Sequence, residues 1–454
     1  MTDLSLAKDY RAIPGPKGLP FFGVLNARPD TLNFYRNMHS EFGELTRYEA
    51  FKKFEWYFVA HPDDIEQVML GSTDVYYKGI GWNRVRMVLG DGLLVSEAGL
   101  HRHQRRIMLP AFNRSHHESY AQTMIEVIDE TIAVWRLKAQ CGETFDMAEA
   151  MMRLALMNVG RAMFGSDMRH IAGPMGRALH TILYWVHLRA VSLESWRGKK
   201  QFQSALADLH GLIDCLIAQR RAQQREGQSF DDVLDLLLKA RDEETGEPLS
   251  DALVRDEMVT MIVAGHETAA VGLSWTWYLL SQNPQCKERL HKEIDTVLNG
   301  RQPTLADLPN MPYLKMTVQE GMRLYPPVWG ISRQTTEEVT IRGYKLPPKA
   351  ILVIFPYVTH RHPDFWEQPD QFNPERFSPE NSQGRPRFAY FPFGGGQRMC
   401  LGASFAMLET QLIVAMIMQQ FEINVVPGHP VEPALYPSLR LKHGLAVTLR
   451  ERQS

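Results

Sequence analysis

Apolar residues recur at helical spacing along most of this 454-residue chain. The clearest periodic segments predict helices over 118–136, 146–164, 171–188, 201–225, 251–281 and 403–420. Segments with strand character are few and short, and they predict strands at 43–50, 56–60, 339–341 and 351–356 and a C-terminal hairpin around 439–449. The chain is therefore predicted to be mainly α with a small β-sheet portion.

The most apolar helical segment, 258–280, is long enough to span a bilayer. However, His266 and Glu267 fall near its middle, where ionisable groups are costly in a membrane. A buried core helix is the better prediction for this segment.

Composition indicates a globular protein, because 44% of the residues are hydrophobic and 22% are charged. No linker, repeat or break in composition interrupts the chain after residue 25, so we expect a polar, proline-rich leader (1–23) and one large domain (24–454). The formal net charge of -2 gives no overall attraction to nucleic acid or to acidic membranes. Any electrostatic partner must therefore meet a local patch.

Cysteine usage and the polar start of the chain favour a reducing cytoplasm and no transmembrane anchor. Cys141, Cys215 and Cys286 are widely spaced and form no C-x-x-C pair, which disfavours a disulfide framework or a zinc site built on them. Residues 1–11 contain no apolar signal core.

Cys400 is the most informative residue for chemistry. It ends a glycine-rich turn before the predicted helix 403–420, where the lack of side chains admits a flat macrocycle and helix amides favour the thiolate. A structural cysteine or a phosphate-binding loop are the alternatives, but a dinucleotide fingerprint starting at Gly394 fails at Met399. We therefore interpret Cys400 as an axial ligand of haem iron.

The residues around Cys400 fit the pattern F-x-x-G-x-R-x-C-x-G, so the chain resembles the cytochrome P450 family. The matching positions are Phe393, Gly396, Arg398, Cys400 and Gly402. The resemblance extends from about residue 14 to the C-terminus. It implies the cytochrome P450 fold, with haem b between a long distal helix and the cysteine-bearing proximal helix.

The family's distal motif, A-G-x-D/E-T, matches residues Ala264 to Thr268 in the predicted helix 251–281. In the family this helix crosses the distal face of the haem, and the acid and alcohol, here Glu267 and Thr268, deliver protons. Thr268 can also bond back to the Ala264 carbonyl, and Gly265 removes bulk. This chain has Ala269 at the position where the family often has a second hydroxyl residue. The alternative interpretation of Thr268 is an ordinary threonine in a core helix.

A structural network is implied by the family's E-x-x-R and P-E-R-F motifs. Glu320 and Arg323 lie three residues apart on one helix face, and Arg376 follows about fifty residues later. Two arginines around one carboxylate can fix an irregular, proline-rich segment.

Cations for the haem propionates are implied by the same resemblance at His101, Arg105, Arg333 and Arg398. The neighbouring Arg102, His103 and Arg106 form either a solvated helix face or a docking surface for an acidic electron-transfer protein. Nucleic acid is not expected, because interleaved aromatic residues are absent.

The implied activity is insertion of one oxygen atom of O2 into a hydrophobic small molecule. Electrons would come ultimately from NAD(P)H through a separate ferredoxin or flavodoxin and its reductase, because the chain contains no flavin or iron–sulfur segment; we expect a monomer. A peroxide-driven peroxygenase and a non-catalytic haem sensor or carrier are the alternatives, and the pair Glu267 and Thr268 disfavours both.

Candidate residues for the substrate pocket are mostly apolar: Trp82, Val263, Val328, Trp329 and Leu439. Core packing is the alternative for each tryptophan. Arg84 or Arg86 could receive a carboxylate, although a solvent-facing role is commoner for arginine. Fatty acids, terpenoids, steroids and polyketides therefore remain open as substrates.

Overall fold

The computed structural model describes residues 8–17, 30–50, 54–166, 168–190, 196–241 and 246–452. Parts of the predicted leader (1–7 and 18–23) lie outside these residues. The chain divides into two compact units, each assembled from segments that are far apart in sequence. Unit 1 contains residues 1–83, 323–371 and 382–400, and unit 2 contains 84–322, 372–381 and 401–454. The expectation of a single domain over 24–454 stays a prediction.

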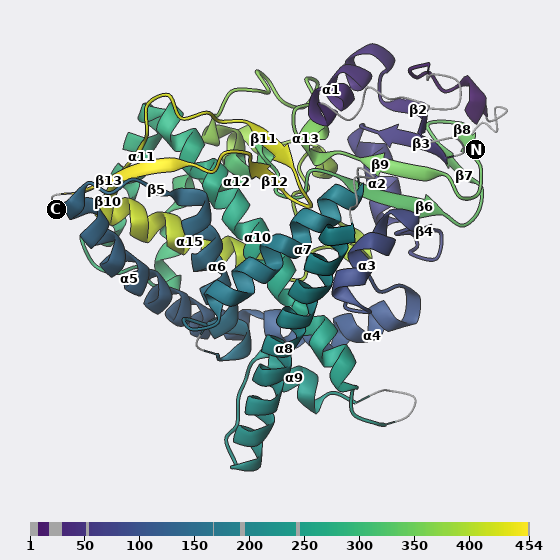
Figure 1. Cartoon of the computed structure of the whole chain (residues 1–454). Coiled ribbons are helices and arrows are strands. Elements are labelled where there is room, and N and C mark those ends of the chain that lie inside the picture. The colour runs from purple at the N-terminus through teal and green to yellow at the C-terminus, as the bar shows by residue number, and fades with distance from the viewer. Residues whose placement is uncertain are drawn as a thin grey trace. The chain divides into compact units, whose positions relative to one another are not determined.

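Unit 1 is built on two small sheets, which Figure 1 shows near the N-terminus. The first has the strand order β2-β3-β9-β6-β4, with β2 Leu45–Ala50, β3 Phe54–Val59, β9 Ile351–Ile354, β6 Ile331–Thr335 and β4 Tyr76–Tyr77. The second has the order β1-β8-β7, with β1 Lys8–Asp9, β8 Tyr344–Leu346 and β7 Val339–Ile341. Among its described residues, the helical segments are η1 Tyr10–Ala12, α1 Thr31–Phe42, α2 Pro62–Leu70, η3 Ile80–Trp82, α13 Pro356–Thr359, η8 Arg387–Ala389 and η9 Gly396–Arg398.

The larger sheet of unit 1 is buried on both faces, which explains the apolar character of its central strands. In β3, Tyr57 and Val59 enter one hydrophobic cluster, whereas Phe58 enters another. In β9, Leu352 and Val353 divide between the same two clusters. Because successive side chains of a strand point to opposite faces, each strand supplies both layers of the core.

Unit 2 is mainly helical. Its long helices are α5 His117–Cys141, α6 Met147–Phe164, α7 Ala172–Ala190, α8 Trp196–Arg225, α10 Asp251–Gln282, α11 Pro284–Leu298, α12 Pro312–Leu324 (which ends in unit 1) and α15 Ala403–Gln420. Its shorter helical segments are α3 Asn83–Leu89, α4 Ala98–Met108, η4 Leu109–Phe112, η5 Arg114–His116, α9 Val233–Lys239, η6 Leu305–Asn310, η7 Pro374–Phe377 and α14 Pro379–Ser382. Its strands are β5 Phe145–Asp146, β10 Phe421–Val425, β11 Pro433–Leu435, β12 Leu439–Leu441 and β13 Ala446–Glu451.

Helix α10 is the core helix of unit 2, as its apolar sequence predicted. Buried residues lie on every side of it, including Trp275 and Trp277, and α6 packs alongside it (Figure 1). A helix that is hydrophobic all round must be buried or span a membrane. Within the part of the chain that the structure describes, no helix is long and apolar enough to cross a bilayer.

The predicted helices agree with the structure, but the predicted hairpin over 439–449 is wrong. β12 pairs with β11, whereas β13 pairs with β10 and β5. The chain turns at Gly444, which has a φ of +66°, and the Asp146 carboxylate accepts the Leu445 N–H at 2.8 Å. This side-chain contact directs β13 toward β5 and away from β12.

Candidate functional site

The cysteine loop, residues 393–402, is a tight turn closed by backbone hydrogen bonds. The Cys400 N–H donates to the Phe393 carbonyl at 2.9 Å, and the Met399 N–H donates to the Gly396 carbonyl at 3.1 Å. These bonds fold the chain back so that the Cys400 side chain is exposed on unit 1. Cys400 itself lies in the loop, three residues before the first residue of α15.

Two glycines of the loop, Gly395 and Gly396, are required by packing against the rest of unit 1. Gly396 has a φ of +64°, and a Cβ at this position would lie 2.2 Å from the Met69 carbonyl oxygen at the end of α2. A Cβ at Gly395 would lie 2.6 Å from the Phe388 ring. Both distances are far below van der Waals contact, so only glycine fits. The expectation that these glycines also admit a cofactor stays a prediction.

The donor chemistry of unit 1 fits a haem. A cysteine thiolate is a suitable axial ligand for iron, and guanidinium groups are suitable partners for propionates. Arg398 lies in η9, two residues before Cys400. Arg333 is buried in β6, and its Nη1 donates to the Ser332 carbonyl at 2.8 Å.

In unit 2, α4 carries the other two residues expected at the propionates. His101 is buried and Arg105 is half-buried, and their spacing of four residues places them on one helix face. The same helix leaves Arg102 and Arg106 exposed. The basic residues of α4 therefore lie on two sides of the helix, with His101 and Arg105 on the more buried side and Arg102 and Arg106 on the exposed side.

The distal motif lies on α10 with the local geometry that its residue types predicted. The Thr268 hydroxyl donates to the Ala264 carbonyl at 2.7 Å, which confirms the expected hydrogen bond within the helix. The absence of a side chain at Gly265 also matters for packing, because a Cβ there would lie 2.9 Å from Val159 of α6. The missing side chain therefore permits close packing of two helices. His266 is buried, and burial lowers its pKa despite its contact with the Ile262 carbonyl at 2.6 Å.

Glu267 is held by two residues that the sequence argument did not identify. Its Oε1 accepts a hydrogen bond from the Ser438 hydroxyl at 2.5 Å and lies 2.6 Å from Nη2 of Arg440. The Arg440 Nε donates to the same oxygen at 2.8 Å. Because the Glu267 side chain is only 3% exposed, this ion pair is largely withdrawn from water and strongly fixed.

The residues of the expected structural network are buried or nearly so, and they hold irregular segments through hydrogen bonds and an ion pair. Glu320 is buried in α12, and its Oε1 accepts the Asn373 N–H at 2.8 Å and lies 3.4 Å from Nε of Arg376. Arg323 donates to the carbonyls of His360, Pro369 and Gln371 at 2.8, 2.7 and 3.1 Å. Glu320 and Arg323 therefore form hydrogen bonds with backbone N–H and C=O groups of irregular segments. In these segments, as the structure describes them, no neighbouring strand pairs with the backbone.

The residues proposed for the substrate pocket divide between the two units, with Trp82, Val328 and Trp329 in unit 1 and Val263 and Leu439 in unit 2. Trp329 stacks on Phe355 at a ring separation of 5.7 Å, so core packing accounts for part of its surface. Leu439 is fully buried.

Two buried carboxylic acids in unit 2 were also not identified from the sequence. Burial raises the pKa of Glu257 on α10 to about 8, and Glu257 Oε2 accepts the Leu93 N–H at 2.9 Å. Burial likewise raises the pKa of Glu409 on α15 to about 8, and Asn158 donates to its Oε1 at 2.9 Å. Their other oxygens, Glu257 Oε1 and Glu409 Oε2, have no hydrogen-bond partner among the described residues. An acidic residue within an apolar helical stretch is the only sequence signal for such sites.

Comparison with known proteins gives a consistent result. The family described as cytochrome P450 matches residues 13–448. Cyclooctatin synthase of Streptomyces melanosporofaciens is 33% identical over 441 residues, which cover 95% of this chain and 94% of that protein. Pentalenene oxygenase of Streptomyces avermitilis is 31% identical over 402 residues, or 87% of this chain and 88% of that protein.

Among solved structures, the crystal structure of the cytochrome P450DA heme domain aligns with a TM-score of 0.89 and 25% identity. The alignment covers 97% of this chain and 98% of that chain. With the cysteine loop and the distal motif described above, these matches show that the chain belongs to the cytochrome P450 family and has its fold.

Proposed function

We propose that this cytochrome P450 monooxygenase inserts one oxygen atom from O2 into a terpenoid. The observation that carries the oxygenase assignment is the pairing of Glu267 with Arg440 beside Thr268, in a chain that also presents Cys400 in the family's loop. A haem sensor or carrier has no need of a fixed distal acid. Peroxide-using relatives generally replace the acid–alcohol pair, so the same observation disfavours a peroxygenase.

Cys400 would bind the haem iron through its thiolate, and His101, Arg105, Arg333 and Arg398 would hold the propionates. When bound, the haem supplies the binding and reductive cleavage of dioxygen. The protein's own contribution is to hold the thiolate at the end of a rigid loop, to position the substrate and to manage protons.

Proton delivery is assigned to Glu267 and Thr268. The Thr268 hydroxyl donates a hydrogen bond to the Ala264 carbonyl, which leaves the lone pairs of Oγ1 able to accept a hydrogen bond from a donor such as water. Arg440 and Ser438 hold the Glu267 carboxyl group in one position through Oε1, and we assign the relay of protons to this group. We therefore expect Arg440 and Ser438 to position the proton donor without contacting the substrate.

The substrate class is proposed from the relatives, since two of them are named for terpenoid chemistry, cyclooctatin synthase and pentalenene oxygenase. The apolar candidates Val263, Val328 and Leu439 are compatible with a hydrocarbon skeleton. Spectral titration of the ferric protein with cyclic terpene hydrocarbons and alcohols, beside fatty acids and steroids, tests this. A preference for fatty acids or steroids would contradict the terpenoid proposal.

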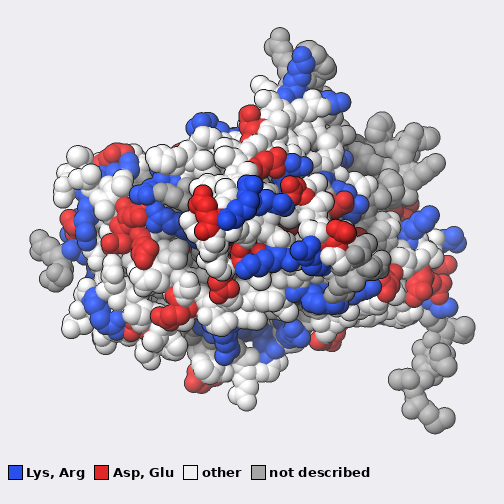
Figure 2. Space-filling view, turned by 90° about the horizontal axis from the view of Figure 1, so that it is seen from below, with Lys and Arg blue, Asp and Glu red and all other residues white. Residues whose placement is uncertain are grey.

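Electrons are proposed to come from a separate acidic ferredoxin or flavodoxin, reduced at the expense of NAD(P)H. The exposed Arg102 and Arg106 of α4 are the proposed contact. On the face shown in Figure 2, Lys and Arg are interspersed with Asp and Glu, as the net charge of -2 suggests. Recognition would then depend on a local cluster and not on the total charge.

Reconstitution with a ferredoxin, its reductase and isotope-labelled dioxygen tests the reaction. We expect one labelled oxygen atom in the product and no turnover after Cys400→Ala. Carbon monoxide binding to the reduced protein should show the absorption typical of thiolate ligation, and Cys400→Ala should abolish it. Turnover with peroxide that exceeds turnover with the redox partners would instead identify a peroxygenase.

A further inference from the structure

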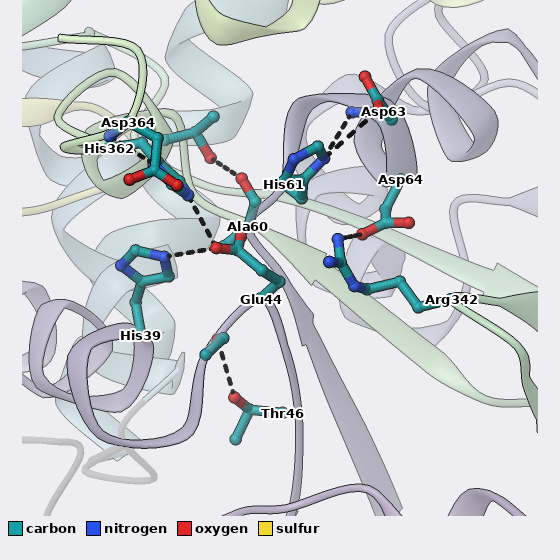
Figure 3. A network of polar contacts seen from close by, with 12 residues as sticks. His39, Glu44, Thr46, Ala60, His61, Asp63, Asp64, Arg342, His362 and Asp364 are labelled. Carbon is teal, nitrogen blue, oxygen red and sulfur yellow. Dashed lines mark hydrogen bonds and ion pairs between the residues drawn. The ribbon is translucent and has the colours of Figure 1, made fainter. Parts of the chain in front are cut away.

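A cluster of two histidines and one glutamate lies in unit 1, outside the residues assigned to haem and substrate. It consists of His39 in the last turn of α1, Glu44 just before β2, and His362 after α13 (Figure 3). The Glu44 Oε1 lies 3.3 Å from Nε2 of His39 and 2.9 Å from Nε2 of His362. One ligand atom from each residue lies within 4.8 Å of the others.

The spacing of these atoms is close to that of a zinc site. With bonds of about 2.0 to 2.1 Å, two ligand atoms on a tetrahedral zinc ion are separated by roughly 3.3 Å. The two nitrogen–oxygen separations already have this size, so only the two histidine nitrogens need to approach each other. Imidazole and carboxylate are ligands that suit zinc.

The cluster has one feature that internal hydrogen bonding does not explain. Both histidines contact the same oxygen of Glu44, whereas Glu44 Oε2 is buried and has no hydrogen-bond partner in the described part of the chain. Glu44 Oε2 is therefore an acceptor atom that is available to a bound ion.

The backbone around the cluster is fixed before any ion binds. Gly43, with a φ of +86°, ends α1 and turns the chain so that Glu44 comes back toward His39. The Ala60 N–H donates to the Glu44 carbonyl at 2.9 Å, and the Thr359 hydroxyl donates to the Ala60 carbonyl at 3.2 Å. Hydrogen bonds to the main chain therefore hold three segments of the chain together without an ion, which favours metal binding.

Two polar groups near the cluster have partners of their own. Asp64 is paired with Arg342 at 2.8 Å, and Nδ1 of His61 accepts the Asp63 N–H at 3.2 Å (Figure 3). One contact opposes metal binding, because the Asp364 N–H donates to Nδ1 of His362 at 3.2 Å and favours a proton on Nε2. This distance is at the long end of the hydrogen-bond range, so it is weak compared with a coordination bond.

From this geometry we propose that His39, Glu44 and His362 form a binding site for a divalent transition ion, most suitably zinc. Three protein ligands leave a fourth position, which either Glu44 Oε2 or a water molecule would take. The ion would join the end of α1, the start of β2 and the segment after α13. Its expected effect is therefore on the stability of unit 1.

The test uses haem-loaded protein freed of other metals by a chelator. Calorimetric titration with Zn²⁺ should give one site per chain, and Zn²⁺ should raise the melting temperature. Co²⁺ should give the visible absorption typical of four- or five-coordinate cobalt. His39→Gln, Glu44→Gln and His362→Gln should each weaken Zn²⁺ binding at least tenfold, whereas the adjacent control His61→Gln should leave it unchanged.

Two results would overturn the proposal. The first is wild-type protein that takes up no stoichiometric Zn²⁺ or Co²⁺. The second is binding that keeps its full affinity in His39→Gln and Glu44→Gln, which would indicate an adventitious surface site. If the buried variant His362→Gln does not fold, the wild-type titration and the two less buried variants still decide the outcome.

Discussion

At the scale of single residues, the cysteine loop shows how one missing side chain supports a functional site. Gly396→Ala should destabilise the protein and lower its haem content, because Ala would adopt a positive φ and would also overlap with the Met69 carbonyl oxygen. The φ alone costs roughly 1–2 kcal/mol, and overpacking adds about 1–3 kcal/mol. Thermal unfolding and haem absorbance measure the two effects.

Gly142→Ala is the matched control for this substitution. Gly142 has a similar φ of +62°, but nothing lies within 4 Å of a Cβ at that position among the described residues. The Gly142→Ala variant should therefore be destabilised only by the positive φ, by roughly 1–2 kcal/mol, and should keep its haem. Equal losses for the two variants would show that the contact with Met69 is unimportant.

The partner of Glu267 gives a second prediction at this scale. Arg440→Gln removes the cation from a carboxylate that is 3% exposed, which should lower the free energy of unfolding by about 3–5 kcal/mol. Less of the consumed NAD(P)H should appear as product, and Arg440→Lys should partly restore this coupling. Denaturant titration and the ratio of product to NAD(P)H are the measurements.

Lys442→Gln, two residues away, is the control, because the pair of Lys442 with Glu432 is more than half exposed and such pairs contribute about 0–1 kcal/mol. An Arg440→Gln variant that is as stable and as well coupled as Lys442→Gln would remove Arg440 from the proton-delivery proposal.

At the scale of elements, the contact between α6 and α15 contains a buried acid that should make stability depend on pH. Burial raises the pKa of Glu409 to about 8, whereas an unfolded glutamate titrates near 4.3. Between these values the folded state binds the proton that the unfolded state has lost, so stability falls as pH rises, with a slope of up to roughly 1.4 kcal/mol per pH unit.

Glu409→Gln should remove one contribution to this slope while keeping the hydrogen bond from Asn158. Glu257, whose pKa is also raised to about 8, should keep the remaining slope of the same sign. The exposed control Glu149→Gln on α6 should leave the slope unchanged. A Glu409→Gln variant with the wild-type slope between pH 5 and 8 would contradict the assignment of a buried, protonated Glu409.

The elements also show what a single sequence can and cannot predict. The periodicity that predicts α10 is local, so its residues 251–282 were found almost to the residue. The hairpin failed because the pairing of β13 with β10 depends on a strand that was not predicted. The motifs identified Glu267, but its partners Ser438 and Arg440 are more than 170 residues away, and no local pattern relates them.

At the scale of the whole molecule, charge should govern the encounter with the redox partner. Arg102→Glu reverses one exposed charge on α4, and it should slow electron transfer from a reduced acidic ferredoxin about tenfold at low salt, with a weaker dependence on ionic strength. Stopped-flow reduction at several salt concentrations measures this. Arg153→Glu, an exposed reversal on α6, is the control and should have little effect. Equal slowing in both variants would mean that total charge, and not α4, guides the encounter.

The parallel pairing of β3 with β9, in which Trp56 lies opposite Ile351, has a consequence for synthesis of the chain. At about 5–20 residues per second, the ribosome needs roughly 15–60 seconds to add the residues between these partners. Throughout that interval the aromatic strand β3 has an open edge, which is a template for incorrect pairing between nascent chains. We therefore expect the yield of this protein in cells to depend on chaperones that cover this edge until the second partner emerges.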